Sequence, residues 1–413
     1  MRFNPKSLLR RAAACVVVLH AWLLLPVNAQ VTNNKVSPDF RLTSGQSARN
    51  IPLELYMNLI FLQVRVNSSR TLWFNLDTGL ETTILDSSQA EALGLKLEDK
   101  SNVSVPGGTI ELAFANGLSF SLPGVEILNQ RVRTLPLSVF TPVLGRPIHG
   151  TLGHDLFKRF VIEIDYANRM ISLYEPKDYK YSGPGETIPV TIEDDQPFVQ
   201  AEIIPPGRAP IKAKLKIDTG STDALGLNGS FVKTVQLISP TQKVVPQPGV
   251  ALGGITENYV TRLGGLRIGE LLIKSPVAGY SKDLTRGGDA GTIGGEIFRR
   301  FKVIFDYSRG RMILEKNTQF DDPYKYDASG LFLAAEGANF ESVKVLRVVE
   351  HTPAAVVGLR EGDVILRIDN KEAKTFSLEQ VRRIFMQQGR TYRLAVERNG
   401  SVIKTKITLR ALI

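Results

Sequence analysis

The chain has 413 residues, of which 43% are hydrophobic and 22% are charged, and its formal net charge is +10. This length predicts two to four domains, and the composition is typical of an ordinary globular protein. The single cysteine, Cys15, lies in the N-terminal apolar segment, so the rest of the chain can form no disulfide, thiolate nucleophile or cysteine-based zinc site. The few histidines are too scattered for a metal site, and no Gly-x-Ser-x-Gly motif indicates a catalytic triad. By elimination, any chemistry must rest on carboxylates.

Residues 1–29 are predicted to be a cleaved signal peptide. Basic residues precede an apolar run over 12–25, and small residues suited to cleavage lie at 27–29. A membrane anchor is the less favoured alternative, because the run is shorter than the roughly 20 residues of a spanning helix and Pro26 closes it. Cleavage removes four cations and no acid, which lowers the net charge from +10 to +6. We therefore expect an exported protein, periplasmic or secreted, with no stable membrane anchor and no nucleic-acid partner.

The most informative motif occurs twice. Asp-Thr-Gly follows a strand-like apolar run at 77–79 and again at 218–220. A Gly-Thr-apolar-Gly motif begins at Gly150 and at Gly291, in each case 73 residues after the Asp of the preceding motif. One copy of Asp-Thr-Gly is consistent with a simple turn after a strand, but chance does not explain the equal spacing. Matching hairpin patterns follow both copies, so a unit of about 140 residues is a domain present twice.

The repeat sets the predicted domain boundaries. The copies span 51–175 and 188–316, and strand patterns dominate both. Residues 30–50 are polar and turn-rich, and we expect them to be poorly ordered. The connectors are predicted at 176–187 and 317–328, and a module with a different pattern spans 329–413.

Three local features add detail to these copies. A short helix is predicted over 87–93 with Ser87 as its cap. The Gly-rich run at 253–256 predicts a hairpin tip, either a mobile flap over a cleft or an ordinary tight turn. The basic residues Arg299, Arg300 and Lys302 are expected on a solvated face.

The module at 329–413 is predicted to be α+β. A Gly-Asp-Val-Ile run at 362–365 leads into a strand that turns at 369–370. Ser377 is placed to cap an amphipathic helix that ends at Phe385. A closing hairpin is predicted to turn at Asn-Gly, residues 399–400.

The paired Asp-Thr-Gly motifs, each with an apolar-Gly partner downstream, resemble those of aspartic proteases. They are most similar to bacterial proteins of retropepsin-like domains, here duplicated in one chain. The resemblance implies a mainly β fold of two tandem retropepsin-like β-barrel lobes, which form a bilobal pseudo-dimer. It also implies a catalytic dyad that holds a water molecule for the hydrolysis of a polypeptide substrate. Asp77 and Asp218 match the dyad, and the residues that match its supporting positions are Thr78, Gly79, Thr219, Gly220, Ser221, Gly153 and Gly294.

Two departures from the family pattern bear on activity. Leu80 stands where the family usually has Ala, Ser or Thr, whereas Ser221 keeps the pattern. A bulky aliphatic side chain cannot donate a hydrogen bond to Asp77 and would desolvate that carboxylate. No tyrosine lies between Tyr56 and Tyr166, so the first copy lacks the flap tyrosine of pepsin-like enzymes. This absence favours the retropepsin-like comparison.

The last module resembles a PDZ domain of the bacterial type. The resemblance rests on Pro-Ala-Ala at 353–355, Gly-Leu at 358–359 and Gly-Asp-Val-Ile at 362–365. It implies that the module binds the C-termini of peptides through a carboxylate-binding loop. The residues in the place of this loop are Gly330, Leu331, Phe332 and Leu333.

Two functions follow from these patterns. The first is an exported aspartic endopeptidase whose PDZ module captures substrate or regulates the lobes. The second is a catalytically inactive peptide-binding protein that keeps the protease fold. Intact acids in both copies favour the enzyme, and Leu80 is the main argument for the alternative. Neither function requires a cofactor or a metal, and we expect a monomer because one chain supplies both acids.

Overall fold

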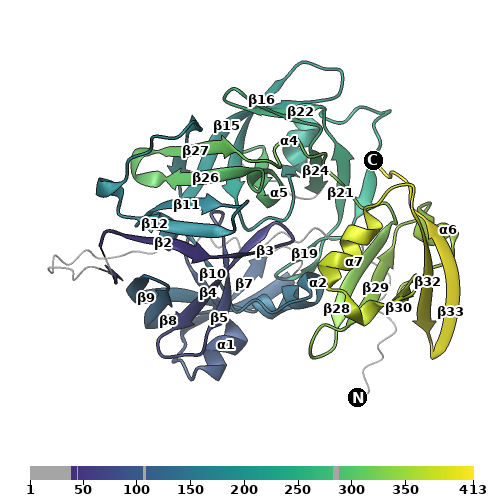
Figure 1. Cartoon of the computed structure of the whole chain (residues 1–413), viewed down its shortest axis with the longest axis horizontal. Helices are drawn as coiled ribbons and strands as arrows, with labels where there is room; N and C mark the ends of the chain where they lie inside the picture. The colour runs from purple at the N-terminus through teal and green to yellow at the C-terminus, as the bar shows by residue number, and fades with distance from the viewer. Residues whose placement is uncertain (1–38, 44, 106–107, 282–287) are drawn as a thin grey trace.

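The computed structural model describes residues 39–43, 45–105, 108–281 and 288–413. The predicted signal peptide lies outside the described residues. Figure 1 shows two strand-rich lobes and a third, smaller unit that forms the C-terminal part of the chain. The predicted mainly β fold is confirmed, because strands account for most of the regular structure and the helices are short. No helix among the described residues is long and apolar enough to cross a membrane.

The first lobe is built on a nine-stranded sheet in the order β1-β9-β6-β10-β5-β4-β8-β7, with β3 paired to β4. The first four residues of β4 are buried. Buried and exposed residues then alternate, because one face of the sheet is solvated at this end of the strand. The strands are β1 (Phe40–Leu42), β3 (Glu54–Tyr56), β4 (Leu59–Val66), β5 (Leu72–Leu76), β6 (Ile84–Asp86), β7 (Glu98–Val105), β8 (Gly108–Leu122), β9 (Val125–Leu135) and β10 (Gly150–Leu152), and the helices are α1 (Ser87–Ala92), η2 (Leu137–Phe140), α2 (Thr141–Leu144), α3 (His154–Phe157) and η3 (Pro176–Asp178).

The second lobe repeats this design in a ten-stranded sheet. Its order is β18-β21-β24-β17-β25-β16-β15-β22-β23, with β14 paired to β15. β25 runs parallel to β16, as β10 runs parallel to β5 in the first lobe. The elements are β14 (Thr191–Glu193), β15 (Gln196–Ile204), β16 (Ile211–Asp218), β17 (Leu225–Asn228), α4 (Gly229–Thr234), β18 (Val245–Gln247), β19 (Val250–Ala251), β20 (Gly254–Ile255), β21 (Asn258–Arg262), β22 (Gly265–Ile268), β23 (Leu271–Lys274), β24 (Val277–Ser281), β25 (Gly291–Gly294), α5 (Gly295–Phe298) and η4 (Tyr307–Arg309).

A six-stranded sheet joins the two lobes. Its order is β13-β27-β26-β11-β12-β2, so the hairpin that ends each copy contributes two neighbouring strands. At its centre β11 and β26 are antiparallel, with Ile164 opposite Val303. One cluster of buried apolar residues extends through both lobes. The strands of this sheet are β2 (Ser47–Pro52), β11 (Val161–Asp165), β12 (Met170–Tyr174), β13 (Glu186–Pro189), β26 (Phe301–Asp306) and β27 (Arg311–Lys316).

The third unit has its own apolar core beneath a six-stranded sheet. The predicted helix is confirmed: the Ser377 hydroxyl accepts a hydrogen bond from the N–H of Gln380, and the N–H of Ser377 donates to the side-chain oxygen of Gln380 in a capping box. The hairpin turn at 399–400 is confirmed as well. The elements are β28 (Leu331–Glu336), β29 (Ser342–Val348), α6 (Pro353–Val356), β30 (Val364–Ile368), β31 (Lys371–Glu372), η5 (Ala373–Thr375), α7 (Leu378–Phe385), β32 (Thr391–Arg398) and β33 (Ser401–Thr408).

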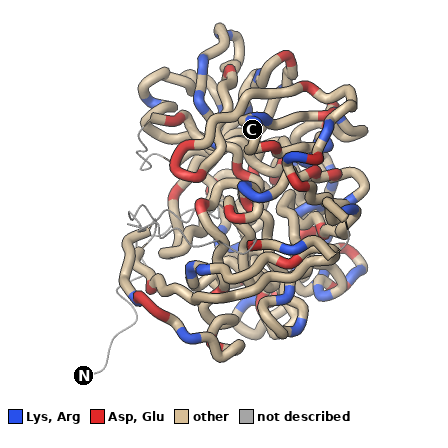
Figure 2. The backbone as a smooth tube through the Cα atoms, turned by 90° about the vertical axis from the view of Figure 1, so that its left-hand side faces the viewer, with Lys and Arg blue, Asp and Glu red and all other residues tan. Residues whose placement is uncertain are grey.

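The third unit docks on the first lobe through β28 and α7, with α2 of the lobe beside β28 (Figure 1). The contact is close, because a Cβ atom added to Gly145 would lie 2.8 Å from Cβ of Leu378. The N–H of Met57 donates to Oε1 of Glu379 at 2.9 Å. Phe332 packs against a buried apolar cluster of the two lobes. Acidic and basic residues are interspersed along the chain, as Figure 2 shows.

Three expectations about local structure are wrong. The cap of α1 is Asp86 rather than Ser87, because the Asp86 carboxylate accepts from the N–H groups of residues 88 and 89 and so starts the helix itself. Part of the segment expected to be poorly ordered forms β1 and β2, which gain backbone hydrogen bonds by pairing with β9 and β12. Arg300 is fully buried rather than solvated. Its guanidinium donates to three carbonyls of the 317–328 connector. The guanidinium carbon lies 3.7 Å from the centroid of the Tyr324 ring.

Candidate active site

Two equivalent loops carry the predicted dyad. Asp77 comes directly after β5, and Asp218 is the last residue of β16. In each loop the glycine two residues later donates its N–H to the Oδ1 of the Asp, at 2.7 Å for Gly79 and 3.1 Å for Gly220. These bonds fix one oxygen of each carboxylate.

The two threonines of the motifs tie the loops together. The Thr78 hydroxyl donates to the carbonyl of Ile217 at 2.8 Å and accepts from the N–H of Thr219 at 3.0 Å. The Thr219 hydroxyl donates to the carbonyl of Leu76 at 2.9 Å and accepts from the N–H of Thr78 at 3.1 Å. All four bonds are buried and cross between the lobes. The lobes are therefore held in register at the site itself.

Each carboxylate lies against the glycine of the opposite loop. A Cβ atom added to Gly79 would be 2.8 Å from Cγ of Asp218, and one added to Gly220 would be 2.2 Å from Cγ of Asp77. Both distances are below van der Waals contact, so neither position has room for a side chain. The structure thus brings Asp77 and Asp218 together at the interface between the lobes.

The two carboxylates are removed from solvent. Asp77 is 0% exposed and Asp218 is 1% exposed. Burial, followed by the nearby charge of Asp218, raises the pKa of Asp77 well above its ordinary value, and the Lys216 ammonium opposes this rise. Oδ2 of Asp77 has no hydrogen-bond partner among the described residues. This pair can therefore hold a proton between carboxylates of unequal surroundings.

Gly153 and Gly294 support the loops from behind, at the ends of β10 and β25. A Cβ atom added to Gly153 would be 2.7 Å from the Thr82 carbonyl oxygen, and one added to Gly294 would be 2.2 Å from that of Asp223. These glycines are required because another chain segment crosses them closely. The carbonyl of Leu152, at the end of β10, also accepts a hydrogen bond from the N–H of Asp77 at 3.0 Å.

The residues that follow the two motifs differ as the sequence indicated. Leu80 is 4% exposed and belongs to the apolar cluster against which Phe332 packs. It provides no hydroxyl next to Asp77, in keeping with the unpartnered Oδ2. Ser221 is buried, and its Oγ accepts from the N–H of Asp223 at 3.4 Å.

Two hairpins meet above this apolar cluster. Val105 and Ile110 come from the β7–β8 hairpin, and Val250 and Leu252 come from the β19–β20 hairpin of the second lobe. The latter is the Gly-rich hairpin predicted at 253–256, placed slightly earlier in the chain. The dyad carboxylates are buried in this conformation.

The carboxylate-binding loop predicted in the third unit already uses two of its N–H groups. The N–H of Gly330 donates to Oδ2 of Asp327 at 2.6 Å, and that of Leu331 donates to Oγ of Ser329 at 3.0 Å. Burial raises the pKa of Asp327 to about 6. An acid of the connector thus occupies a donor that was expected to face a peptide.

The groove between β28 and α7 is also bridged. β28 is an edge strand, as a peptide-binding strand must be. Nη2 of Arg382 donates to the carbonyl of Leu333 at 2.7 Å across the groove, and Nη1 lies 3.1 Å from the sulfur of Met57. Phe332 packs against an apolar cluster of the two lobes rather than lining an open groove. Of the four predicted loop residues, Phe332 therefore lies at the docking contact, whereas Leu331 and Leu333 pack in the core of the third unit.

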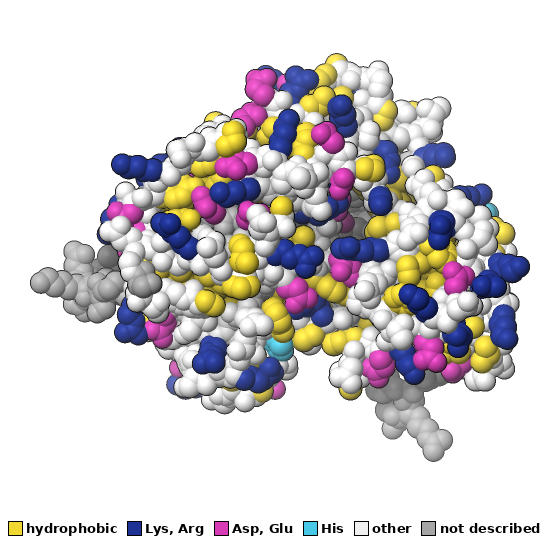
Figure 3. All heavy atoms as spheres, viewed as in Figure 1, with side chains coloured by type: hydrophobic (Ala, Val, Ile, Leu, Met, Phe, Trp, Pro, Cys, Tyr) yellow, Lys and Arg dark blue, Asp and Glu magenta, His cyan; other side chains and the backbone are white. Residues whose placement is uncertain are grey.

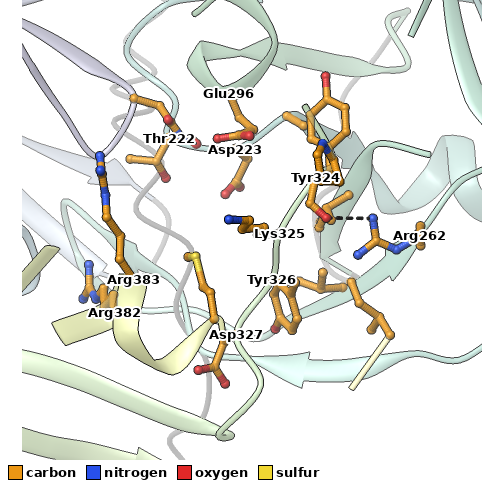
Figure 4. A pocket seen from close by; sticks show the side chains of 18 of the residues that line it. Thr222, Asp223, Arg262, Glu296, Tyr324, Lys325, Tyr326, Asp327, Arg382 and Arg383 are labelled. Atoms are coloured by element: carbon orange, nitrogen blue, oxygen red, sulfur yellow. Dashed lines mark hydrogen bonds between the residues drawn. The ribbon is translucent and has the colours of Figure 1, made fainter. Parts of the chain in front are cut away.

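A cavity of about 1440 Å³ is lined by both lobes, the 317–328 connector and the third unit. Figure 3 shows the hollow on the surface, and Figure 4 shows charged side chains of both signs around it. Asp223 and Glu296 face Lys325, and Arg382 and Arg383 approach from α7. Burial raises the pKa of Asp223 to about 7. The sequence did not predict this cavity, because segments far apart in the chain form it.

Lys216 and its counterpart Asn75 were not among the predicted site residues. Each lies two residues before a dyad aspartate, and so on the same face of its strand. Lys216 is 2% exposed and Asn75 is 0% exposed. The strand period alone could have indicated that both side chains point toward the site.

Two parts of the chain match known protein families. A family model described as an aspartyl protease matches residues 62–156, which include Asp77 and most of the first lobe. A model described as a PDZ domain matches residues 314–409. The chain combines an aspartyl protease domain with a C-terminal PDZ domain. The suspected architecture is thereby confirmed. No curated protein matches the chain.

The described residues of the aspartyl protease and PDZ domains contain no cluster of His, Cys, Asp or Glu suited to a metal ion.

Proposed function

We propose that the protein is an exported aspartic endopeptidase that hydrolyses peptide bonds with a water molecule activated between Asp77 and Asp218. One observation carries this proposal: each carboxylate is fixed by its own loop and lies against the glycine of the other loop. The pattern of residues 1–29 supports export to the periplasm or the medium.

The chemistry follows from two buried like charges. Because neighbouring carboxylates cannot both ionise at low cost, the pair shares one proton. The ionised member accepts a proton from water as its oxygen attacks the peptide carbonyl carbon, and the protonated member donates to the carbonyl oxygen. The substrate is a polypeptide that enters when the hairpins separate. One chain carries both acids, so we propose that the protein acts as a monomer, which sedimentation at working concentration would test.

The test compares wild type with Asp77→Asn and Asp218→Asn on a mixed peptide library from pH 3 to pH 8. Each substitution keeps the volume of the side chain and removes one ionisable carboxyl, so each should abolish cleavage while circular dichroism stays unchanged. Asp165→Asn, at the end of β11, controls for the loss of an acid elsewhere. Cleavage at the wild-type rate by either dyad variant would rule out the proposal.

The enclosed dyad supports a second candidate, an inactive peptide-binding protein with the protease fold. The same library separates the two functions. Binding without cleavage at every pH, unchanged by Asp218→Asn, would establish the alternative. Cleavage lost in both dyad variants would exclude it.

The PDZ domain implies peptide binding, and we propose that its ligands are extended peptides with a free C-terminus. They would add to the edge of β28 after Arg382 releases the carbonyl of Leu333. The full chain would be titrated with peptides that end in an apolar residue, either free or amidated. Tighter binding of the free form, strengthened further in Arg382→Met, is the expected result. Equal affinity for both forms would contradict carboxylate recognition.

A further inference from the structure

Lys216 is a charged residue in the interior of the second lobe. On β16 the residues Lys214, Lys216 and Asp218 share one face, since strand side chains alternate. Lys214 lies toward the outer end, where its Nζ contacts Oε2 of Glu193 at 2.6 Å and its side chain is 27% exposed. The Lys216 side chain, by contrast, is 3% exposed. An ammonium at such depth requires a nearby negative partner.

The partners of Lys216 belong to the dyad. Its Nζ lies 3.7 Å from Oδ2 of Asp218 and donates to the carbonyl of Gly79 at 3.3 Å. The first contact pairs the ammonium with one dyad carboxylate. The second reaches across the interface to the loop that carries the other carboxylate. One side chain of the second lobe therefore acts on both halves of the site.

The first lobe has no equivalent charge. Asn75 occupies the matching position in β5, and it is also completely buried. Its amide nitrogen and oxygen have no hydrogen-bond partner among the described residues. The two carboxylates have the same loop geometry, but the second lobe adds a buried cation whose Nζ lies within ion-pair distance of Asp218. The surroundings of the two carboxylates therefore differ at this position, which is Asn75 in β5 and Lys216 in β16.

We propose that Lys216 is a positioning residue that places the shared proton on Asp77 and keeps Asp218 ionised. This proposal rests on the proposed endopeptidase function for its consequence, which is that Asp218 accepts the proton of water and Asp77 donates to the carbonyl oxygen. With Lys216 protonated, Asp218 ionised and Asp77 neutral, the three groups carry no net charge. A buried site favours this arrangement over one with an unbalanced charge.

The other titratable groups around the dyad do not replace Lys216. Tyr307 lies near Asp77, and burial raises the pKa of its hydroxyl well above its ordinary value, so that it stays neutral. Asp223 lies on the side of Asp218, and burial raises its pKa to about 7, so its ionised form would oppose the ionisation of Asp218. Glu296 is itself paired with Arg299 at 2.7 Å. Of Tyr307, Asp223 and Lys216, Lys216 alone carries the positive charge that favours an ionised Asp218.

Removal of the ammonium gives a measurable shift. In Lys216→Met the ionised form of Asp218 loses its partner, so its pKa rises. The acid limb of the profile of kcat/KM against pH should move upward by about one to three pH units, the usual effect of an opposite charge at this distance. Lys216→Arg retains the charge and should keep the limb closer to that of wild type. Lys214→Met removes an ammonium from the same strand face and should leave the profile unchanged. An acid limb that does not move in Lys216→Met would overturn the proposal.

A second measurement needs neither activity nor a folded variant at position 216. The wild-type chain, labelled with ¹³C at the aspartate carboxyls, would be titrated by NMR, with the dyad signals assigned through Asp77→Asn and Asp218→Asn. The expected result is that Asp218 ionises at a lower pH than Asp77. The reverse order, or equal values, would overturn the proposal even in an active enzyme. The expected order in a protein that cleaves no peptide would instead reject the proposed function and keep the role of Lys216.

Discussion

Replacement of Thr219 by valine tests how the lobes are held together at the site. Valine has nearly the same shape, so the change removes the hydroxyl without a cavity. It leaves two buried groups without their partner, the carbonyl of Leu76 and the N–H of Thr78. Each unsatisfied group costs about 1–3 kcal/mol, so the free energy of unfolding should fall by about 2–6 kcal/mol. This loss is large because a whole domain is typically stable by only about 5–15 kcal/mol.

Urea unfolding, followed by the fluorescence of Trp73, measures this loss. Trp73 is in β5, the strand that leads to the first loop, and it is the sole tryptophan among the described residues. Thr408→Val is a suitable control, since its hydroxyl bonds to that of Thr391 at 2.8 Å on an exposed surface. The control should change stability by less than about 0.5 kcal/mol. A loss in Thr219→Val no larger than that of the control would show that the cross-links do not hold the lobes.

Three further predictions concern single residues. Because the pKa of Asp77 is raised in the folded state, wild type loses stability as the pH rises from the unfolded value near 4 through the folded pKa. Asp77→Asn should therefore have a higher urea midpoint than wild type at pH 7 and no such advantage at pH 3; the opposite order would contradict the raised pKa. Leu80→Ser supplies a hydroxyl beside Asp77 and should shift one limb of the pH–rate profile, whereas an unchanged profile would mean that this hydroxyl does not reach the carboxylate. Arg300→Met leaves the carbonyls of the connector without their donor, so limited proteolysis should cut within 317–328 faster than in wild type. Lys302→Met is the matched control, and equal cleavage of both variants would refute a structural role for Arg300.

Features set by local sequence could be predicted. The equal spacing of the two motif pairs indicated a duplicated domain, because a tight carboxylate-bearing loop and its crossing strand must recur together. The helix after Ser377 was predictable, since its cap and its apolar face lie within a few residues of each other. The hairpin at 399–400 was predictable because Asn-Gly suits a tight turn.

Features that depend on distant segments could not be predicted. Arg300 was predicted to be a surface residue because nothing near it in the sequence indicates a buried partner. Its acceptors are carbonyls of the connector about twenty residues later. Nothing in the local sequence indicated that the Asp327 carboxylate would accept a hydrogen bond from the N–H of Gly330. Lys216 lies in a run with Lys214 that resembles the solvated face of a strand, and its burial depends on Asp218 and on the carbonyl of Gly79 in the opposite lobe.

The central sheet, in which β11 and β26 pair across the lobes, has a consequence for how such a site can change over time. When two identical chains build one site, every substitution appears twice, and a lysine beside one carboxylate implies a lysine beside the other. A continuous chain is free of that constraint. It can keep Asn75 in one copy and Lys216 in the other, or Leu80 in one and Ser221 in the other. Covalent fusion thus allows the two acids to specialise independently, without any change in the loops that present them.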